Sequence, residues 1–281
     1  MKTRRKVSLE LSSLPECPGV YLFYGIHDEL LYVGKSKSIR TRVRSHFAVK
    51  HERRLCRSIR RIETRQTAGE LGALLLESQL IKEQKPMFNV ASKRRRRIVI
   101  ARRVDNAEGY ATIHLDAIDY LQLDASRPIL GIFKHKTQAK EFLAQIAKTH
   151  RLCPKLLRLE QSRTYCFSYH LGQCSGACMA EEDAPVYNAR VDEAFGERRI
   201  KAWPFNGTIQ IEESSPDGSM KESFIIDNWC LLESTTRQNG KQEPFLQHTH
   251  RFDYDSYKIL LAFITSPDNK DFISVLPSAS R

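Results

Sequence analysis

The sequence predicts an α+β protein that begins with a small three-stranded antiparallel sheet and flanking helices. A cysteine-bearing segment and a mixed α/β C-terminal region are expected to follow. The sheet is predicted from three short runs rich in aromatic and β-branched residues, at 19–24, 30–34 and 62–67. The helices are predicted from apolar residues that recur at helical spacing between and after these runs. Four cysteines between residues 153 and 178 define the cysteine-bearing segment.

The first two runs are expected to pair as a hairpin, because the polar residues 25–29 connect them. Ser36 is expected to cap a helix over residues 37–47, in which apolar residues recur at every fourth position. A second basic helix is predicted over residues 50–61, before the third strand.

A long helix is predicted over residues 70–84, because a glycine precedes it and a proline follows it. Beyond it we expect a pair of strands at 97–104 and 110–115 and an amphipathic helix over 136–151. The charge balance changes near residues 98–105, which indicates a domain boundary. The predicted divisions are an N-terminal extension (1–14), a first domain (15–100), a connecting region with the cysteines (101–180) and a C-terminal region that could dock a protein (181–281).

The net charge of +12 is concentrated in residues 35–103, which contain 21 lysines and arginines against five glutamates and no aspartate. Such a field attracts polyanions, so nucleic acid is the first partner to consider. An anionic lipid surface and a simple role in solubility are the alternatives. No run approaches the roughly 18–20 apolar residues of a membrane helix, and no apolar signal segment follows the basic N-terminus. Seven cysteines, an odd number, do not indicate a secreted disulfide framework, so we expect a cytoplasmic protein with no membrane role.

Glu77 lies in the middle of an apolar stripe of the helix predicted over 70–84. Its neighbours three and four positions away are all apolar: Ala73, Leu74, Leu80 and Ile81. An ionised carboxylate in such a place needs compensation. One interpretation is a structural ion pair with one of the nearby arginines. The other is a hard metal ion such as Mg²⁺, which binds few protein ligands when phosphate oxygens and water complete its coordination.

The tripeptides Gly19-Val20-Tyr21 and Tyr32-Val33-Gly34, separated by ten residues, resemble the signature of the GIY-YIG nucleases. Lys35, Arg42, Glu77 and Asn89 stand where that family carries its other motif residues. The stretch from Ala73 to Asn89 is similar to the nuclease domain of the nucleotide-excision-repair protein UvrC. The resemblance covers about residues 15–100 and implies a metal-dependent DNA endonuclease that acts by in-line attack of water on a phosphodiester.

The resemblance also implies a role for each motif residue. Glu77 would be the sole direct protein ligand of Mg²⁺ or Mn²⁺, and Arg42 would stabilise charge on the phosphoryl oxygens. Tyr32 is assigned as general base in preference to Tyr21. A phenol has an ordinary pKa of about 10, so this role needs nearby cations such as Lys35 and Arg42, or the metal. The remaining member, Asn89, would orient groups around the metal.

Basic residues around the motif are the candidate contacts to the DNA backbone, because nothing in the sequence suggests an element that reads bases. They are Lys37, Arg40, Arg44, His46, Lys93, Arg94, Arg95, Arg96 and Arg97. UvrC-like domains often carry a tyrosine at the position of His46, so an auxiliary role is expected for this residue.

The cysteines Cys153, Cys166, Cys174 and Cys178 are separated by 12, 7 and 3 residues. Ordinary buried thiols and a zinc site are open alternatives, although the paired spacing of a zinc knuckle is absent. The stretch from Cys166 to Cys178 is similar to the cysteine motif of UvrC. That resemblance implies an iron–sulfur cluster, a [4Fe–4S] cluster being the candidate.

UvrC makes two incisions with a second nuclease domain and helix-hairpin-helix elements, for which the 103 residues after Cys178 are too few. The chain is therefore expected to be a short UvrC homologue that cuts damaged duplex DNA only on the 3′ side of a lesion. Its expected partner is the UvrB–DNA pre-incision complex loaded by UvrA, and it would work alongside UvrC. Trp229 is a candidate docking residue for UvrB. The alternatives are a sequence-specific GIY-YIG endonuclease of the restriction or mobile-element type and a non-catalytic DNA-binding relic.

Overall fold

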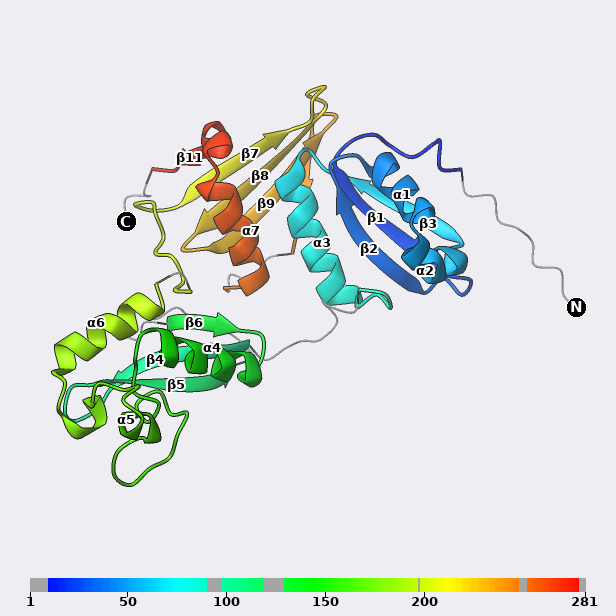
Figure 1. Cartoon of the computed structure of the whole chain (residues 1–281). Helices are drawn as coiled ribbons and strands as arrows, with labels where there is room; N and C mark the ends of the chain where they lie inside the picture. The colour runs from blue at the N-terminus through cyan, green and yellow to red at the C-terminus, as the bar shows by residue number, and fades with distance from the viewer. Residues whose placement is uncertain (1–9, 90–97, 119–128, 197, 248–251, 278–281) are drawn as a thin grey trace, which may run out of the picture. The chain divides into compact units, whose positions relative to one another are not determined.

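The computed structural model describes residues 10–89, 98–118, 129–196, 198–247 and 252–277. The chain forms two compact units (Figure 1). One unit combines residues 1–95 with residues 203–281, and the other contains residues 96–202. In the described ranges no helix is both long enough and apolar enough to cross a bilayer.

The N-terminal sheet has the three antiparallel strands that the sequence predicts, in the order β2-β1-β3. Their bounds are β1 Gly19–Tyr24, β2 Leu30–Ser36 and β3 Arg61–Gln66. In the β1–β2 hairpin Tyr21 stands opposite Gly34, and Phe23 stands opposite Tyr32. The register therefore brings the two motif tripeptides side by side.

Two helical stretches cover this sheet, and both begin or end differently from the prediction. Helix α1 is Ile39–Ala48, so it starts two residues late, and the Ser36 hydroxyl donates to the Ser38 carbonyl instead of capping the helix. The expected helix over 50–61 is shorter, because the backbone becomes extended at Ile59, whose side chain is buried. The stretch contains a 3₁₀ turn, η1 Lys50–Glu52, and a short helix, α2 Arg53–Ser58.

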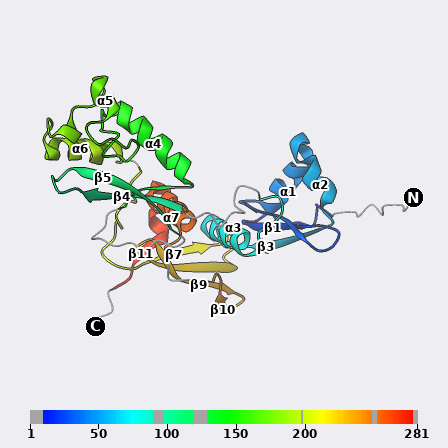
Figure 2. The ribbon, with the colours of Figure 1, turned by 90° about the horizontal axis from the view of Figure 1, so that it is seen from below.

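Helix α3, Glu70–Gln84, has the bounds that the sequence predicts. It ends at Lys85, which adopts the left-handed conformation immediately before Pro86. In Figures 1 and 2 the helix lies between the three-stranded sheet and a second, five-stranded sheet. The helix that carries Glu77 is therefore held from two sides.

The second sheet is antiparallel, with the strand order β10-β9-β8-β7-β11. Its strands are β7 Ile209–Ser214, β8 Met220–Asp227, β9 Cys230–Gln238, β10 Lys241–Pro244 and β11 Ile273–Val275. Helix α7, Tyr254–Thr265, and the 3₁₀ helix η3, Pro267–Phe272, complete this part. Trp229 is 2% exposed and packs edge-on against Trp203 and Tyr257, so it is a core residue and cannot be the docking residue that we expected.

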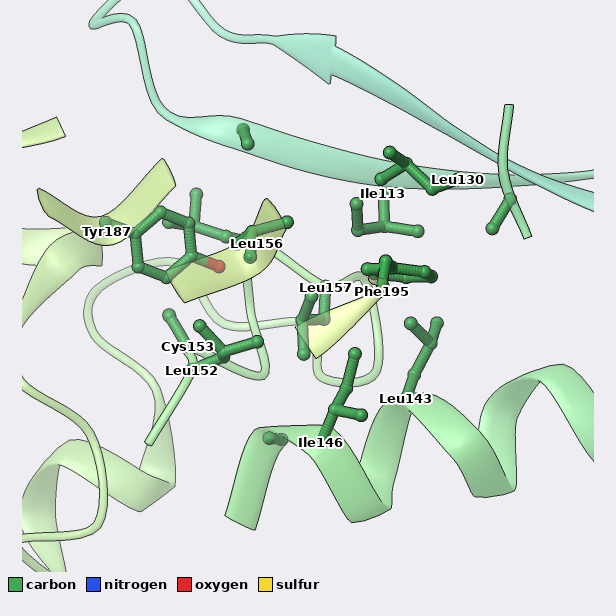
Figure 3. Close-up of a cluster of buried hydrophobic side chains, with 14 of the residues drawn as sticks. Ile113, Leu130, Leu143, Ile146, Leu152, Cys153, Leu156, Leu157, Tyr187 and Phe195 are labelled. Carbon is green, nitrogen blue, oxygen red and sulfur yellow. The ribbon is translucent and has the colours of Figure 1, made fainter. Parts of the chain in front are cut away.

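The unit formed by residues 96–202 has its own three-stranded antiparallel sheet, in the order β5-β4-β6. Its elements are β4 Ile98–Asp105, β5 Ala111–Ile118, β6 Ile129–Phe133, α4 Lys136–Thr149, α5 Phe167–His170, η2 Ala177–Met179 and α6 Ala184–Ala194. Aliphatic side chains of α4 pack towards the sheet, and Cys153 lies beside Leu152 and Tyr187 at one end of this core (Figure 3). Three of the four predicted cysteine ligands belong to the core.

Candidate active site

A cavity of about 450 Å³ opens on the first unit at the edge of the N-terminal sheet. Five of the six predicted catalytic residues line it: Tyr21, Tyr32, Lys35, Arg42 and Glu77. Ser36, Lys37 and Glu70 complete the lining. Residues from β1, β2, α1 and α3 thus meet at one place, as the motif predicts.

Glu77 projects from α3 to the cavity, and its Oε1 atom accepts a hydrogen bond of 3.0 Å from the backbone N–H of Lys35. Burial raises the pKa of the Glu77 carboxyl, and the Lys35 N–H and the charges of Lys35 and Arg42 offset this only in part. Among the described residues no cation forms an ion pair with Glu77. The carboxylate is therefore half-buried, faces an open cavity and has no direct contact with a counter-charge from the described ranges.

Glu70, in the first turn of α3, is a member of the site that the sequence analysis did not select. Its carboxylate contacts Lys35 Nζ at 2.7 Å and Lys37 Nζ at 2.8 Å. Burial alone would raise the pKa of Glu70, but the two lysines lower it overall. Lys35 is thereby held at the wall of the cavity. The sequence could have indicated Glu70 as a site residue, because it stands at the start of the predicted helix, two turns before Glu77.

Close contacts explain why the two motif tripeptides carry glycine at positions 19 and 34. A Cβ atom on Gly34 would lie 2.3 Å from the Tyr21 hydroxyl, so any larger residue would displace the ring. Gly19, at the start of β1, has φ +155°, and a Cβ atom there would lie 2.3 Å from the carbonyl oxygen of Arg65. Gly34 is therefore required by its packing against Tyr21, and Gly19 by its φ angle and its close approach to the backbone of β3.

Both phenols at the cavity are held in their neutral forms. Burial raises the pKa of Tyr21 well above its ordinary value, and Arg42 opposes this only in part. Burial and the negative charge of Glu77 raise the pKa of Tyr32, against the effects of Arg42 and of a hydrogen bond with Tyr21. Lys35, the other cation expected to act on Tyr32, is paired with Glu70. The protein alone therefore does not make either tyrosine a phenolate at neutral pH.

His46 is 1% exposed and lies inside the domain, where its ring packs edge-on against Tyr21, Phe23 and Tyr32. Its Nε2 atom is 2.7 Å from the Tyr21 hydroxyl, and its Nδ1 atom is 2.6 Å from Oε2 of Glu52. The prediction that His46 contacts the DNA backbone is therefore wrong, because its side chain is buried. The sequence analysis did not select Glu52. Its position as the only acidic residue in the basic stretch 50–61 could have indicated it.

Asn89 does not line the cavity, although the motif placed it among the catalytic residues. Its side-chain oxygen accepts from the Val33 N–H at 2.9 Å, and its amide nitrogen donates to the Val33 carbonyl at 2.8 Å. Asn89 thus pairs with the backbone of β2 between Tyr32 and Gly34. The structure gives it the geometry of a residue that positions this strand.

The residues predicted to contact DNA differ in their exposure and in whether their charge is paired within the protein. Arg44 is exposed, and Lys37 is exposed while paired with Glu70 at the mouth of the cavity. The Arg40 guanidinium donates to the Leu14 carbonyl and to Glu16, both at 2.6 Å, and so binds the preceding segment to α1. Lys93, Arg94, Arg95, Arg96 and Arg97 lie outside the described residues.

The four cysteines of the other unit form a cluster of thiols. The sulfur atoms of Cys153, Cys166 and Cys174 lie within 4.8 Å of one another, and all three residues are buried. The Cys178 sulfur accepts a hydrogen bond of 3.4 Å from the N–H of Cys166. A hydrogen bond from Cys153 lowers the pKa of the Cys174 thiol, and the N–H groups of Gly176 and Ala177 act in the same direction. Such a set of sulfur donors suits a thiophilic metal.

Comparison with known families agrees with this arrangement along the chain. The UvrC-like GIY-YIG domain matches residues 17–90, the middle domain of the UvrC/Cho excinucleases matches residues 95–197, and the C-terminal domain of excinuclease Cho matches residues 208–279. The excinuclease Cho of Escherichia coli K12 is 37% identical over 257 residues, which cover 89% of this chain and 83% of that protein. The chain belongs to the excinuclease Cho family.

Membership of the Cho family confirms the predicted class, a metal-dependent DNA endonuclease of nucleotide excision repair. It also excludes the restriction-type alternative. The Cho protein of Salmonella typhimurium is 36% identical over 255 residues, covering 89% of this chain and 84% of that protein. The UvrC protein of Gemmatimonas aurantiaca is 31% identical over 208 residues, covering 66% of this chain but only 31% of that protein.

Among solved structures, this member of the Cho family is similar to the N-terminal endonuclease domain of UvrC from Thermotoga maritima bound to magnesium. The sequence identity is 30% and the TM-score is 0.28, with 31% of this chain and 99% of that chain covered. A point mutant of the same domain bound to its divalent cation gives 29% identity and the same TM-score.

Proposed function

We propose that this chain cuts one strand of a damaged DNA duplex on the 3′ side of the lesion, using a single divalent cation held by Glu77. The observation that carries the proposal is the convergence of Glu77, Arg42 and Tyr32 on one open cavity. A carboxylate, a guanidinium and a phenol in one cavity supply a metal ligand, a donor to phosphoryl oxygens and a proton acceptor.

The residues of the cavity fit a hard cation. The Glu77 carboxylate has a free oxygen, since only Oε1 is used by the Lys35 N–H, and no ammonium or guanidinium among the described residues is paired with it. Mg²⁺ and Mn²⁺ accept sites with one carboxylate when water and phosphate fill the remaining positions. When bound, the cation would neutralise the negative charge that builds up on the phosphate.

The protein's own groups divide the remaining tasks. Arg42 presents its guanidinium to the phosphoryl oxygens. Tyr32 accepts the proton of the attacking water as general base, with Tyr21 beside it. Lys35, oriented by Glu70, places a positive charge next to the incoming phosphate. Asn89 keeps β2, and with it Tyr32, in place through the backbone of Val33.

The DNA would be bound through its backbone by the exposed Arg44, by Lys37 and by the basic residues 93–97. Recruitment would depend on the UvrB–DNA pre-incision complex loaded by UvrA, and the enzyme would act alongside UvrC. The five-stranded C-terminal sheet with α7 would be the docking domain for this complex, because it contributes no side chain to the cavity.

The test is to map incision of an end-labelled duplex with one bulky lesion, in Mg²⁺, with and without UvrA and UvrB. We expect a single cut 3′ to the lesion that requires UvrB and is absent with Glu77→Ala. Glu83→Ala is the matched control, because Glu83 is an exposed carboxylate on the same helix. Cutting of undamaged DNA, cutting by Glu77→Ala, or no cutting under any of these conditions would contradict the proposal.

For the other unit, an iron–sulfur cluster held by Cys153, Cys166, Cys174 and Cys178 is part of the proposal. The converging sulfur atoms and the N–H donors around them support it. Such a cluster would act in structure or in DNA sensing, away from the hydrolytic site. Iron content and absorbance near 400 nm after anaerobic purification test the cluster. If the purified protein contains stoichiometric zinc and no iron, the site is a zinc site and the cluster proposal is wrong. All seven cysteines are free thiols, which suits the proposed cytoplasmic location.

A further inference from the structure

We infer that His46, oriented by Glu52, is the final acceptor of the proton that leaves the attacking water, and that Tyr21 relays this proton to it. The inference rests on the proposed nuclease function and extends it. His46 does not touch the substrate, so it is a positioning and proton-accepting residue that acts only through Tyr21.

The direction of the hydrogen bonds follows from the chemistry of the three groups. A carboxylate only accepts hydrogen bonds, so the contact of 2.6 Å between Glu52 Oε2 and His46 Nδ1 requires a proton on Nδ1. A neutral imidazole then has its lone pair on Nε2. The Tyr21 hydroxyl, 2.7 Å from Nε2, must therefore donate to it. Tyr21 keeps its oxygen lone pairs for donors on the cavity side.

The surroundings keep His46 able to accept a proton near neutral pH. Burial lowers the pKa of His46 below its ordinary value, Arg42 lowers it further, and Glu52 opposes both. The imidazole is therefore neutral at pH 7, and Glu52 is in place to stabilise the imidazolium that forms. The charged and titratable groups that face His46 from the surrounding elements are Tyr21, Tyr32, Arg42, Glu52 and Cys56, and the exposed His51 lies 4.0 Å from Glu52.

The relay solves the difficulty that neither phenol is ionised. As the water oxygen forms its bond to phosphorus and the bond to the leaving oxygen breaks, Tyr32 takes a proton from the water and gives its own to Tyr21, with which it shares a hydrogen bond. Tyr21 gives its proton to His46 Nε2, which leaves an imidazolium beside the Glu52 carboxylate. The leaving oxygen takes a proton from solvent, and His46 later returns its proton by the same hydroxyls. No phenolate has to exist before the attack.

The first test uses the whole protein without metal or DNA. Long-range ¹⁵N–¹H correlation of histidine side chains should show His46 at pH 7.5 as the neutral tautomer with its proton on Nδ1. The His46 signal is assigned by its absence from the spectrum of His46→Gln. If this signal shows the proton on Nε2, the inference is overturned. Because it needs no cleavage, this result stands even if the proposed nuclease function fails.

The second test is the pH profile of single-turnover cleavage of the lesion duplex. For the wild type we expect the rate to fall at pH values below the ordinary pKa range of histidine, where the imidazolium that forms can no longer accept a proton. His46→Gln should be about 10²-fold slower at pH 7.5, and its rate should rise tenfold per pH unit up to pH 9, because a phenol must then ionise. Glu52→Gln should move the acid limb to lower pH, since the carboxylate no longer supports the imidazolium.

His27→Gln is the control for the pH profile, because His27 is an exposed histidine in the β1–β2 turn. It should keep the wild-type rate and profile. Thermal unfolding and near-ultraviolet circular dichroism must show that His46→Gln and Glu52→Gln are folded. A folded His46→Gln that is slower but retains the acid limb of the wild type would reduce His46 to a packing residue and refute the relay.

Discussion

Two carboxylic acids at helix α3 have different surroundings: Glu77, which is half-buried at the cavity, and Glu222 of β8, which is buried. Glu77 has one backbone hydrogen bond and an open side towards the cavity. Glu222 is 1% exposed, and a Cβ atom on Gly72 would lie 1.9 Å from its Oε2 atom. Within the described parts of the chain neither oxygen of Glu222 has a well-formed hydrogen bond, and burial raises its pKa to about 8.

The difference teaches that burial of a carboxyl indicates a binding site only when the carboxyl also faces a cavity. Burial raises the pKa of both groups. Solvent and cations can reach Glu77, so a ligand can compensate its charge. Glu222 is enclosed, and the protein compensates by keeping it protonated at neutral pH. One carboxyl therefore makes a site, and the other makes stability depend on pH.

The largest expected effect follows from Glu77→Gln. Loss of the cation should slow cleavage by at least about 10³-fold, since a metal supplies several kcal/mol of transition-state stabilisation. The free energy of unfolding should stay the same or increase, because a neutral amide is easier to bury than this carboxylate. Single-turnover cleavage and urea unfolding measure the two quantities. A loss of stability of more than about 3 kcal/mol would support the structural ion pair that the sequence left open.

Glu222→Gln should remove a pH dependence of stability. The stabilising neutral form of Glu222 is fully present below its unfolded pKa of about 4.5, and the contribution is lost as pH rises through about 8. Keeping the group protonated at pH 7 costs on the order of 3 kcal/mol. Between pH 5 and pH 8 the wild type should therefore lose more stability than Glu222→Gln does. Urea unfolding at both pH values measures this, and parallel curves would show that Glu222 is not protonated.

Glu213→Ala should destabilise the protein by about 2 kcal/mol, because two N–H groups at the start of α3 lose their acceptors. The two oxygens of Glu213 accept from Leu71 and Gly72 at 2.9 Å each. Glu212→Ala, at an exposed position of the same strand, is the control. A shift in thermal unfolding equal to that of the control would mean that water replaces Glu213 at no cost.

Asn89→Ala should lower the free energy of unfolding by about 1 kcal/mol, less than Glu213→Ala, because it removes the pairing with the backbone of Val33. Asn89 and Glu213 are comparable, since each side chain pairs with the backbone of an element that carries site residues, Asn89 with β2 and Glu213 with α3. Cleavage should slow about tenfold through a less ordered β2. A loss as large as that of Glu77→Gln, with unchanged stability, would instead place Asn89 among the groups that act on the metal or phosphate.

Local patterns were sufficient wherever a feature depends on neighbours along the chain. The apolar neighbours of Glu77 marked it as unusual, and the spacing of the two tripeptides predicted the hairpin that pairs Tyr21 with Gly34. The expected DNA contact of His46 was wrong because the helical pattern does not show which face of α1 meets the sheet. Trp229 was wrong for a similar reason, since its packing against Trp203 and Tyr257 joins distant segments.

The sequence by itself determined the class of the protein, the bounds of α3 and most of the residues around the cavity, because these depend on periodicity and on a short ordered motif. Only the tertiary structure decided which polar groups satisfy one another. The contact between Glu213 and Leu71 spans 142 residues, and that between Tyr21 and His46 spans 25. Hydrogen bonds act over about 3 Å, so groups that far apart in sequence become partners only after the sheets and helices have packed.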